Sequence, residues 1–412
     1  MQYLWEIAFW VAASWLAYVY VGYPMLLWVA GFAKEFKPLP ETSDLPSVSV
    51  LVSARNEKKD IGWKIKETLS WDYPADKLEM LVASDASDDG TDEILRTTND
   101  ARFHFLRLEK RSGKNQALNH LHEIAKGDLL FFTDANSHID AGCLRRVVTH
   151  FLDSRVGCVT GTERTIREGE ETAVVTGTRA FLGYESLVNN LESHLGSVLV
   201  CDGSIFCLRK SLFHPLQPEL ANDFELPIRA GDAGHAILFD PTAISLEKAT
   251  SSPIEEFRRK KRICGQGMLG FLRMRGILNG FRLWQFLSRK LMRWFGAVPL
   301  AVILGSSLLL WNHPIYKAVL LLQLFTYSLA LAGWAFAASG KEGSRLTTFP
   351  FYFVMVNVAA MIGAVEGMLG KKYSVWESPA KSRGTHAAPA NQPEATQSNL
   401  SAETNLTSVT RE

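Results

Sequence analysis

Three features of common enzyme classes are absent from this sequence. No glycine-rich phosphate loop follows any of the expected strands, which argues against a dinucleotide-binding or P-loop enzyme. The five cysteines are odd in number and include no CxxC pair, so we expect reduced thiols and neither a disulfide framework nor a zinc site. Asp85–Gly90 is similar to the start of a calcium-binding loop, but Arg96 stands where such a loop needs glutamate. Any phosphate group bound by this protein must therefore be neutralised by a divalent ion and basic side chains.

Charged residues are missing from four long stretches of the chain. Each stretch has 20 or more residues without Asp, Glu, Lys or Arg. Such a length can cross a hydrocarbon core of roughly 30 Å as a helix. The four are Ile7–Ala33, Trp294–Tyr316, Ala318–Gly340 and Leu346–Val365. We therefore expect a multi-pass membrane protein.

The first of these stretches is interpreted as a retained anchor. It follows Glu6 rather than a basic segment, it is too long for the apolar part of a signal peptide, and it lacks a clear cleavage site. Lys34 and Lys37 follow it, and basic residues precede the second stretch. The positive-inside rule therefore predicts that the region between the two lies in the cytoplasm, at the inner membrane of a cell.

The order of apolar and mixed segments divides the chain into five parts. Residues 1–44 are the anchor, 45–255 a cytosolic domain, 256–293 basic interfacial helices, 294–370 the C-terminal transmembrane helices, and 371–412 a disordered polar tail. The side of the membrane on which the tail lies stays open. Three C-terminal spans would place it outside, whereas Lys371 and Lys372 favour the inside. Glu366 directly follows the last apolar stretch, and a charged residue at this position agrees with a segment that is re-entrant or interfacial.

The net charge of +1 is unevenly distributed along the chain. Between Phe257 and Arg293 there are eleven Lys or Arg residues and no acidic residue, interleaved with aromatic side chains. Nucleic-acid binding is one interpretation of such a stretch. Its position directly before an apolar segment favours the anionic surface of a membrane instead. We expect no nucleic-acid partner, and we expect part of the stretch to face an anionic substrate.

Strands and helices are predicted to alternate in the cytosolic domain. Strands are expected at 47–53, 78–84, 103–108 and 128–133, and helices at 61–69, 91–98 and 115–125. Thr91 is the expected N-cap of the second helix. This alternation predicts a mainly parallel sheet with flanking helices and right-handed crossovers. Because ligands bind beyond the carboxyl ends of such strands, the polar residues that follow three of them should converge on one site.

Six short motifs occur in a fixed order. They are Ser53–Glu57, Ser84–Thr91, Gly113–Asn119, Thr133–Asn136, Asn222–Phe224 and Arg258–Arg262. Together they resemble the family 2 glycosyltransferases, specifically the membrane-embedded branch that includes cellulose, hyaluronan and poly-N-acetylglucosamine synthases. The resemblance implies an α/β domain of the GT-A type inserted between transmembrane helices. It also implies transfer of a sugar, with inversion, from a nucleoside diphosphate to an acceptor hydroxyl in polysaccharide or cell-envelope synthesis.

The resemblance implies roles for individual residues. Asp223 would be the general base, Asp85 would contact the nucleoside, and Lys114 would lie near the donor. Asp134 and Asn136 would hold Mg²⁺ or Mn²⁺ on the donor diphosphate. The other expected substrate-binding residues are Ala54, Arg55, Glu57, Asp88, Arg259 and Arg262. These residue types suit the chemistry, because a diphosphate leaves readily only when its charge is neutralised and an acceptor hydroxyl must lose its proton.

Each acidic residue also has a structural interpretation. Asp134 could be a turn residue at the end of a strand, and Asp85 and Asp88 could stabilise the start of a helix. Asp223 could lie at a solvated helix start. Glu225, two residues further along, is the other candidate for its catalytic role.

The sequence departs from the family pattern in two motifs. Asn136 replaces the second acid of the usual Asp-x-Asp metal motif. In the Gln-x-x-Arg-Trp motif of processive members, Arg259 stands in place of the glutamine and Ile263 in place of the tryptophan. The missing tryptophan favours transfer of one sugar to a lipid-linked acceptor over synthesis of a long glycan. UDP-sugar is the expected donor, with membrane lipids and accessory envelope subunits as further expected partners. The alternative is a scaffold or transport component with a degenerate domain, supported only by Asn136 and Arg259.

Overall fold

The computed structural model describes residues 1–373 except 32–43, 167–172, 249–251, 279 and 340–342. Its strands are β1 (Val48–Ala54), β2 (Leu78–Asp85), β3 (Phe103–Leu108), β4 (Leu129–Thr133), β5 (His138–Ile139), β6 (Val156–Thr165), β7 (Ile205–Arg209) and β8 (Ala236–Glu247). The helices that precede or lie within the sheet domain are α1 (Gln2–Ala17), η1 (Tyr18–Gly22), α2 (Tyr23–Gly31), α3 (Ile61–Leu69), η2 (Ala75–Lys77), α4 (Thr91–Thr97), α5 (Lys114–Ile124), α6 (Cys143–Thr149), η3 (His150–Leu152), α7 (Ala173–His194), η4 (Lys210–Leu212) and α8 (Asn222–Asp232). Those that follow it are α9 (Pro253–Met274), α10 (Gly280–Gln285), η5 (Phe286–Leu291), α11 (Met292–Trp294), α12 (Ala297–Leu309), α13 (Pro314–Ala338) and α14 (Arg345–Met368). Lys34, Lys37 and the predicted tail from residue 374 onward lie outside the described residues.

The described strands form an eight-stranded sheet in the order β3-β2-β1-β4-β7-β6-β8-β5. β1 pairs in parallel with β2 and β4, and β2 pairs in parallel with β3. β7 is antiparallel to both β4 and β6, while β6 and β8 are parallel. The prediction of a mainly parallel sheet with flanking helices is confirmed, and the antiparallel β7 is an addition that the sequence analysis did not anticipate.

Both faces of the sheet are covered, which explains why β1 is apolar at almost every position. Val50 and Val52 point into a cluster that includes residues of α3, α4 and α6. Leu51, on the opposite face, packs with residues of α5 and α8. The bounds of the four predicted strands agree with β1 to β4 to within one residue at each end. The N-cap prediction was wrong, because the N-cap of α4 is Gly90 (φ 100°) and Thr91 is its first helical residue. The Thr91 hydroxyl instead accepts a hydrogen bond from the backbone N–H of Glu57.

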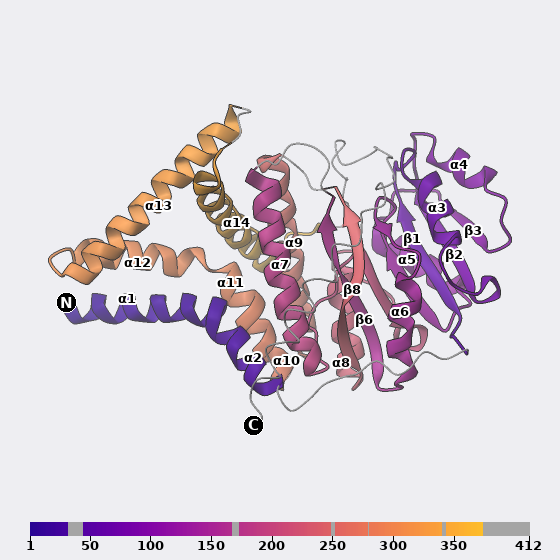
Figure 1. Cartoon of the computed structure of the whole chain (residues 1–412), viewed down its shortest axis with the longest axis horizontal. Coiled ribbons are helices and arrows are strands. Elements are labelled where there is room, and N and C mark those ends of the chain that lie inside the picture. Colours follow the sequence, from indigo (N-terminus) through magenta and orange to yellow (C-terminus); the bar gives the residue numbers. More distant parts are fainter. Residues whose placement is uncertain (32–43, 167–172, 249–251, 279, 340–342, 374–412) are drawn as a thin grey trace, which may run out of the picture.

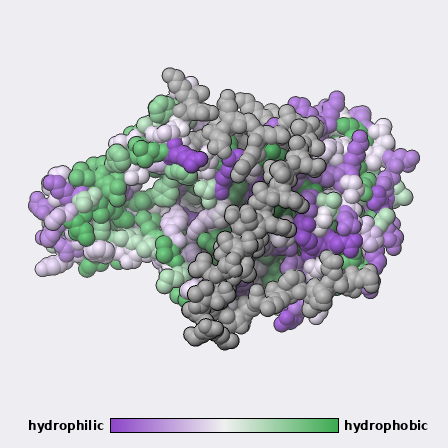
Figure 2. All heavy atoms as spheres, viewed as in Figure 1, coloured by the Kyte–Doolittle hydropathy of each residue, from purple (hydrophilic) through white to green (hydrophobic). Residues whose placement is uncertain are grey.

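The apolar helices project from one side of the sheet domain (Figure 1). Among the described residues, Gln2–Gly31, Pro314–Ala338 and Arg345–Met368 are long and apolar enough to cross a membrane. The predicted span at 294–316 is not one helix. The chain bends by 57° between Gly280–Trp294 and Ala297–Leu309, and a new helix, α13, begins at Pro314. Figure 2 shows apolar residues gathered over the projecting helices and polar residues at their far tip. This surface supports association with a membrane.

α9 connects the sheet domain to these helices. Its Gly265, Gly267 and Gly270 form a GxGxxG pattern, but the pattern lies inside a helix and not after a strand. A Cβ atom at Gly267 would lie 2.6 Å from the ring of Trp294, and one at Gly270 would lie 2.7 Å from the ring of Phe224. These glycines therefore allow close packing, and they are not a phosphate loop.

Candidate active site

A pocket opens at the carboxyl ends of β1, β2 and β4. It has a cavity volume of about 400 Å³. Nine of the predicted site residues line it: Arg55, Glu57, Asp85, Lys114, Asp134, Asn136, Asp223, Arg259 and Arg262. Two others do not. Ala54 is fully buried in the core beneath the strand ends, and Asp88 is exposed on the loop before α4.

The loops after β1 and β2 hold each other in place. The Arg55 guanidinium donates hydrogen bonds to the backbone carbonyls of Asp85 (2.6 Å) and Ala86 (2.5 Å). Asn56 and Ala86 both have positive φ angles, 55° and 52°. Such angles are uncommon outside glycine and tend to occur at functional sites. In this structure they turn the two loops so that Arg55 and Asp85 meet.

Asp85 fixes the start of α5. Its carboxylate accepts hydrogen bonds from the backbone N–H groups of Ser112 (2.6 Å) and Gly113 (2.9 Å). Gly113 has φ 88°, a conformation that favours glycine. Asp85 therefore has a structural role in placing Lys114, the first residue of α5, and it also forms part of the pocket wall.

Lys114 and Asp134 meet across the pocket floor. The Lys114 ammonium lies 2.6 Å from Oδ1 of Asp134, the residue that follows β4. Burial would lower the pKa of Lys114, but the charge and hydrogen bond of Asp134 outweigh it and raise that pKa. Lys114 is therefore a cation at neutral pH. Asp134 is paired with a cation, which a simple turn residue would not require.

Asp223 and Glu225 lie in the first turn of α8 but have different surroundings. Asp223 lines the pocket, whereas Glu225 is fully buried and paired with Arg229 at 2.9 Å. Burial raises the pKa of Asp223, while the charges of Lys114 and Arg262 act in the opposite direction. Of the two acids, only Asp223 faces the pocket.

Four acidic residues on the pocket wall were missed by the sequence analysis: Glu255 in the first turn of α9 and three residues of the sheet domain. Glu163 and Glu247 come from the ends of β6 and β8, and Asp202 precedes β7. Burial and the charge of Glu163 raise the pKa of Asp202 to about 6, and burial with the charges of Glu163 and Asp134 raises the pKa of Glu247 to about 8. No short motif marks these residues, since distant strands bring them together. The raised pKa values of Asp202 and Glu247 indicate that this wall would favour additional positive charge.

The opposite wall of the pocket is basic and comes from α9. Arg259 pairs with Glu163 at 3.0 Å and so joins α9 to the sheet. Burial and the neighbouring charge of Arg259 lower the pKa of Arg262 to about 10, so Arg262 remains a cation at neutral pH. Ile263, in the position of the missing tryptophan, also lines the pocket.

The residues present fit a hard divalent cation in the chemistry of their oxygen atoms. Among the described residues no group of three or more His, Cys, Asp and Glu is arranged to hold a metal. Asp134 and Asn136 nevertheless both line the pocket and offer a carboxylate and an amide oxygen. Mg²⁺ commonly binds through one or two such protein groups and takes its remaining ligands from water and substrate phosphates.

The pocket also reaches residues outside the sheet domain. Lys290 of η5, Trp294 of α11 and Tyr373 after α14 complete its wall. The sequence analysis assigned these residues to interfacial or membrane segments and to the tail, and it did not anticipate that they reach the site.

Comparison with known proteins identifies the sheet domain. Residues 49–214 match the profile of glycosyl transferase family 2. The chain therefore contains a family 2 glycosyltransferase domain. The family resemblance inferred from the motifs is confirmed, and the matched residues run from β1 to just after η4 and include four of the six motifs.

Two relatives and one solved structure resemble this chain. The probable glycosyltransferase YdaM of Bacillus subtilis is 28% identical over 57% of this chain and 60% of its own length. The β-monoglucosyldiacylglycerol synthase of Synechocystis is 30% identical over 37% of this chain and 34% of its own length. The chain thus spans less than two thirds of either relative.

The solved structure is the mannosyltransferase PcManGT of Pyrobaculum calidifontis, in complex with GDP-mannose and Mn²⁺. It superposes with a TM-score of 0.65 at 20% identity, over 89% of this chain and the whole of that protein. This likeness establishes a GT-A-like fold for the family 2 domain.

Proposed function

We propose that this protein is a membrane-associated glycosyltransferase that moves one sugar from a nucleoside diphosphate, UDP being the favoured one, to an acceptor hydroxyl. The observation that carries the proposal is the meeting of Lys114, Asp134, Asp223 and Arg262 in one pocket at the carboxyl edge of the sheet. The family 2 domain makes sugar transfer the reaction class. Asp223 supplies a base, Asp134 supplies a carboxylate that can hold a divalent ion, and Lys114 and Arg262 supply positive charge.

Asp223 is the proposed general base. As the acceptor oxygen bonds to the anomeric carbon of the donor sugar, Asp223 takes the hydroxyl proton. The bond from that carbon to the diphosphate breaks, and the diphosphate leaves with the electron pair. The raised pKa that burial gives Asp223 improves its match to the proton it accepts.

The donor diphosphate is proposed to bind beside Asp134. When bound there, Mg²⁺ or Mn²⁺ would neutralise charge that develops on the leaving group. Asp134 and Asn136 would hold the ion, and Lys114 and Arg262 add positive charge on the protein side of the same pocket. The Mn²⁺ in the similar mannosyltransferase structure supports this assignment.

The acceptor is proposed to be a lipid rather than a growing glycan. Ile263 lines the pocket where processive members carry the tryptophan on which successive sugars stack, and the aromatic residues of this pocket, Phe224, Trp294 and Tyr373, come from other positions. The pocket wall continues through Lys290 and Trp294 to the apolar helix α12, so a lipid headgroup could enter from the membrane side. The Synechocystis relative is itself named for a lipid product.

The test uses the full-length protein in detergent or nanodiscs with a panel of UDP- and GDP-sugars, Mg²⁺ or Mn²⁺, and lipid and oligosaccharide acceptors. We expect release of nucleoside diphosphate that EDTA stops. Asp134→Ala and Asp223→Asn should abolish it, while Asp76→Asn, on the exposed opposite edge of the sheet, should not. Absence of metal-dependent donor binding under all conditions would refute the proposal and favour a scaffold.

We also propose that residue 373 lies on the cytoplasmic side with the catalytic domain. Lys372 pairs with Glu219 at 2.8 Å, and Gln266 donates a hydrogen bond to the Tyr373 carbonyl. These contacts tie the end of α14 to the sheet domain and α9. Of an apolar 18-residue segment of α14, 44% is buried inside the protein, compared with 17% for each of the other two candidate spans.

In this arrangement Gln2–Gly31 and α13 cross the membrane, α12 crosses it as the apolar half of the bent pair Gly280–Trp294 and Ala297–Leu309, and α14 lies against the cytoplasmic domain. Two crossings after the domain return the chain to the cytoplasm and agree with the basic residues Lys371 and Lys372. An epitope fused after residue 412 should therefore resist external protease on intact cells stripped of their wall. A second epitope placed at the turn between α12 and α13 should be digested. Digestion of the C-terminal epitope would exclude this topology.

A further inference from the structure

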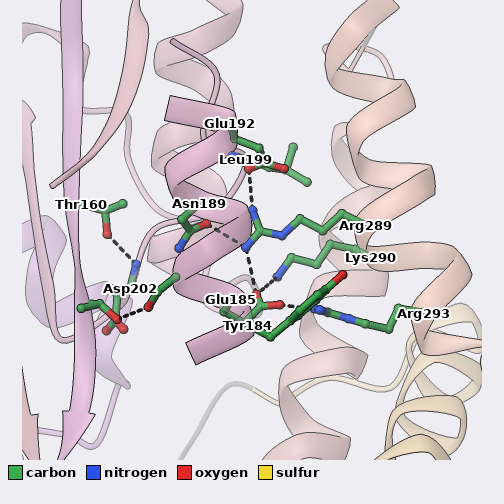
Figure 3. Close-up of polar contacts among 12 residues, drawn as sticks. Thr160, Tyr184, Glu185, Asn189, Glu192, Leu199, Asp202, Arg289, Lys290 and Arg293 are labelled. Atoms are coloured by element: carbon green, nitrogen blue, oxygen red, sulfur yellow. Dashed lines mark hydrogen bonds and ion pairs between the residues drawn. The ribbon is translucent and has the colours of Figure 1, made fainter. Parts of the chain in front are cut away.

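A group of buried ionic side chains joins α7 to η5 and α11. Arg289 pairs with Glu192 at 2.5 Å and with Glu185 at 2.9 Å. Lys290 pairs with Glu185 at 3.3 Å, and Arg293 also pairs with Glu185. Figure 3 shows the two carboxylates projecting from α7 toward the three cations of the neighbouring segment. We call these five residues the α7–η5 ionic cluster.

The α7–η5 ionic cluster has one more positive charge than negative. Its three cations are only 2% (Arg289), 15% (Lys290) and 12% (Arg293) exposed. Burial would raise the pKa of Glu185, but the charges of Arg293, Lys290 and Arg289 outweigh it and hold that pKa well below its ordinary value. Glu185 therefore carries one negative charge that three cations share. An uncompensated buried charge is costly, and it is often retained for binding.

The surplus charge faces the pocket through Lys290. Lys290 lines the pocket, whereas Arg289 and Arg293 do not. Arg289 is held by two carboxylates and by the Asn189 side chain. Among the residues that the structure describes, Glu185 is the only carboxylate within ion-pair distance of Lys290. The Lys290 ammonium is thus the cation of the cluster with room for a second anion.

Lys290 occupies the part of the pocket nearest the membrane helices. Trp294, one helical turn further along, lines the same wall, and the apolar helix α12 begins three residues later at Ala297. Asp223 lies in the same pocket, and the charge of Lys290 is among those that oppose the burial-induced rise in its pKa. A molecule that contacts Lys290 and Asp223 together would therefore extend from the membrane surface to the proposed base.

We propose that Lys290 binds the phosphate of an anionic lipid acceptor whose free hydroxyl lies against Asp223. The inference rests on the proposed glycosyltransferase function and names the class of acceptor: a membrane lipid that carries both a phosphate and an alcohol. Its acyl chains remain among the apolar helices while its headgroup enters the pocket.

The reaction then follows the course already described. The alcohol oxygen of the lipid headgroup forms the new bond to the anomeric carbon, and its proton passes to Asp223. The bond between that carbon and the diphosphate breaks, and the nucleoside diphosphate leaves. The lipid phosphate takes no part in bond formation, and its role is to hold the headgroup in position through Lys290.

The experiment compares two acceptors in nanodiscs of phosphatidylcholine, which has a phosphate but no free hydroxyl. Phosphatidylglycerol offers a hydroxyl and a phosphate, and diacylglycerol offers a hydroxyl alone. Full-length wild type, Lys290→Gln and Lys290→Arg are supplied with the donor, and the glycolipid is measured by mass spectrometry. Lys66→Gln, on the exposed face of α3, is the matched control. Thermal melting and donor binding check that each variant is folded.

We expect phosphatidylglycerol to be the better acceptor. Lys290→Gln should lower kcat/KM for phosphatidylglycerol about tenfold through KM, as expected for loss of a hydrogen bond to a charged group. It should change kcat/KM for diacylglycerol much less, and Lys290→Arg should retain most of the wild-type preference. Equal use of both lipids, equal loss with both, or loss through the KM of the donor would overturn the inference.

Failure of this inference can be told apart from failure of the proposed function. Metal-dependent transfer to diacylglycerol or to an oligosaccharide, with no preference for phosphatidylglycerol, would overturn the lipid assignment and leave the glycosyltransferase in place. Absence of donor binding and of nucleoside diphosphate release with every acceptor would overturn both.

Discussion

Two acids in the first turn of α8 allow the proposed mechanism to be tested by a matched pair of variants. Asp223→Asn and Glu225→Gln each replace a carboxylate with an amide of similar size. Asp223 faces the pocket beside Lys114 and Arg262, whereas Glu225 is buried against Arg229 and the backbone of Gln217. We therefore expect Asp223→Asn to affect the reaction and Glu225→Gln to affect stability.

The expected magnitudes follow from these surroundings. Loss of a general base typically lowers kcat by about 10²- to 10⁴-fold, and the Asp223→Asn substitution should leave the fold intact because the pocket can solvate an amide. For Glu225→Gln, breaking a fully buried ion pair costs about 3–5 kcal/mol. Arg229 is 25% exposed and can reach water. We therefore expect a smaller loss, of about 1–3 kcal/mol in the free energy of unfolding.

The assay measures kcat for sugar transfer and the melting temperature of each variant in the same detergent. Asp223→Asn should melt within about a degree or two of the wild type, and Glu225→Gln should melt several degrees lower while the folded protein keeps its kcat. The reasoning is refuted if Asp223→Asn keeps wild-type kcat, or if Glu225→Gln loses activity with no change in melting temperature. Either result would move the base to another residue.

Two further predictions concern pH and packing. Burial and the charges of Glu163 and Asp134 raise the pKa of Glu247 to about 8, so between 4.5 and 8 the folded protein holds a proton that the unfolded chain has released. The free energy of unfolding should fall as the pH rises through this range, and wild type should melt several degrees lower at about pH 9 than at about pH 6, whereas Glu247→Gln should show a flatter profile. In α9, Gly270→Ala would place its Cβ 2.7 Å from the ring of Phe224, next to Asp223, and should lower both the melting temperature and kcat through a strain of about 1–3 kcal/mol. Gly305→Ala, where a Cβ meets nothing within 4 Å, should leave both unchanged or raise the melting temperature slightly; equal losses for the two glycines would contradict the packing argument.

The half of the sheet built from β1 to β4 could be predicted from the sequence because its signals are local. Each of these strands is a short apolar run, and each is followed by polar residues at the edge where parallel strands bind ligands. The same reasoning placed Asp85 and Asp134 at one edge of the sheet, and both line the pocket, as does Lys114, which was assigned from the family resemblance. Ala54, buried in the core, and Asp88, on an exposed loop, are not among the lining residues, and their predicted role in substrate binding stays a prediction.

The rest of the site depends on contacts between distant segments and has no local signal. Glu163 and Glu247 reach the pocket because β6 and β8 pair in parallel, a long-range pairing that the sequence pattern did not specify. Lys290 and Trp294 reach it because α9 turns the chain back onto α8 through closely packed glycines. Composition placed Lys290 in the basic interfacial segment, part of which was expected to face an anionic substrate, and Trp294 at the start of the membrane helices, but it did not identify which side chains reach the pocket.

The distribution of charge in the pocket indicates how the site is assembled. Most of the acids that line the pocket, including Asp134, Glu163 and Glu247, come from the sheet domain, whereas Arg259, Arg262 and Lys290 come from segments that lead into the apolar helices. Glu163 of β6 and Arg259 of α9 form an ion pair at 3.0 Å, which joins the sheet domain to α9. The sheet domain also brings Arg55 and Lys114 to the pocket. Separated from α9 and η5, it should keep its strands but lack Arg259, Arg262 and Lys290, which are three of the six Lys and Arg side chains lining the pocket, so we expect packing of the membrane-proximal helices to be required for full activity.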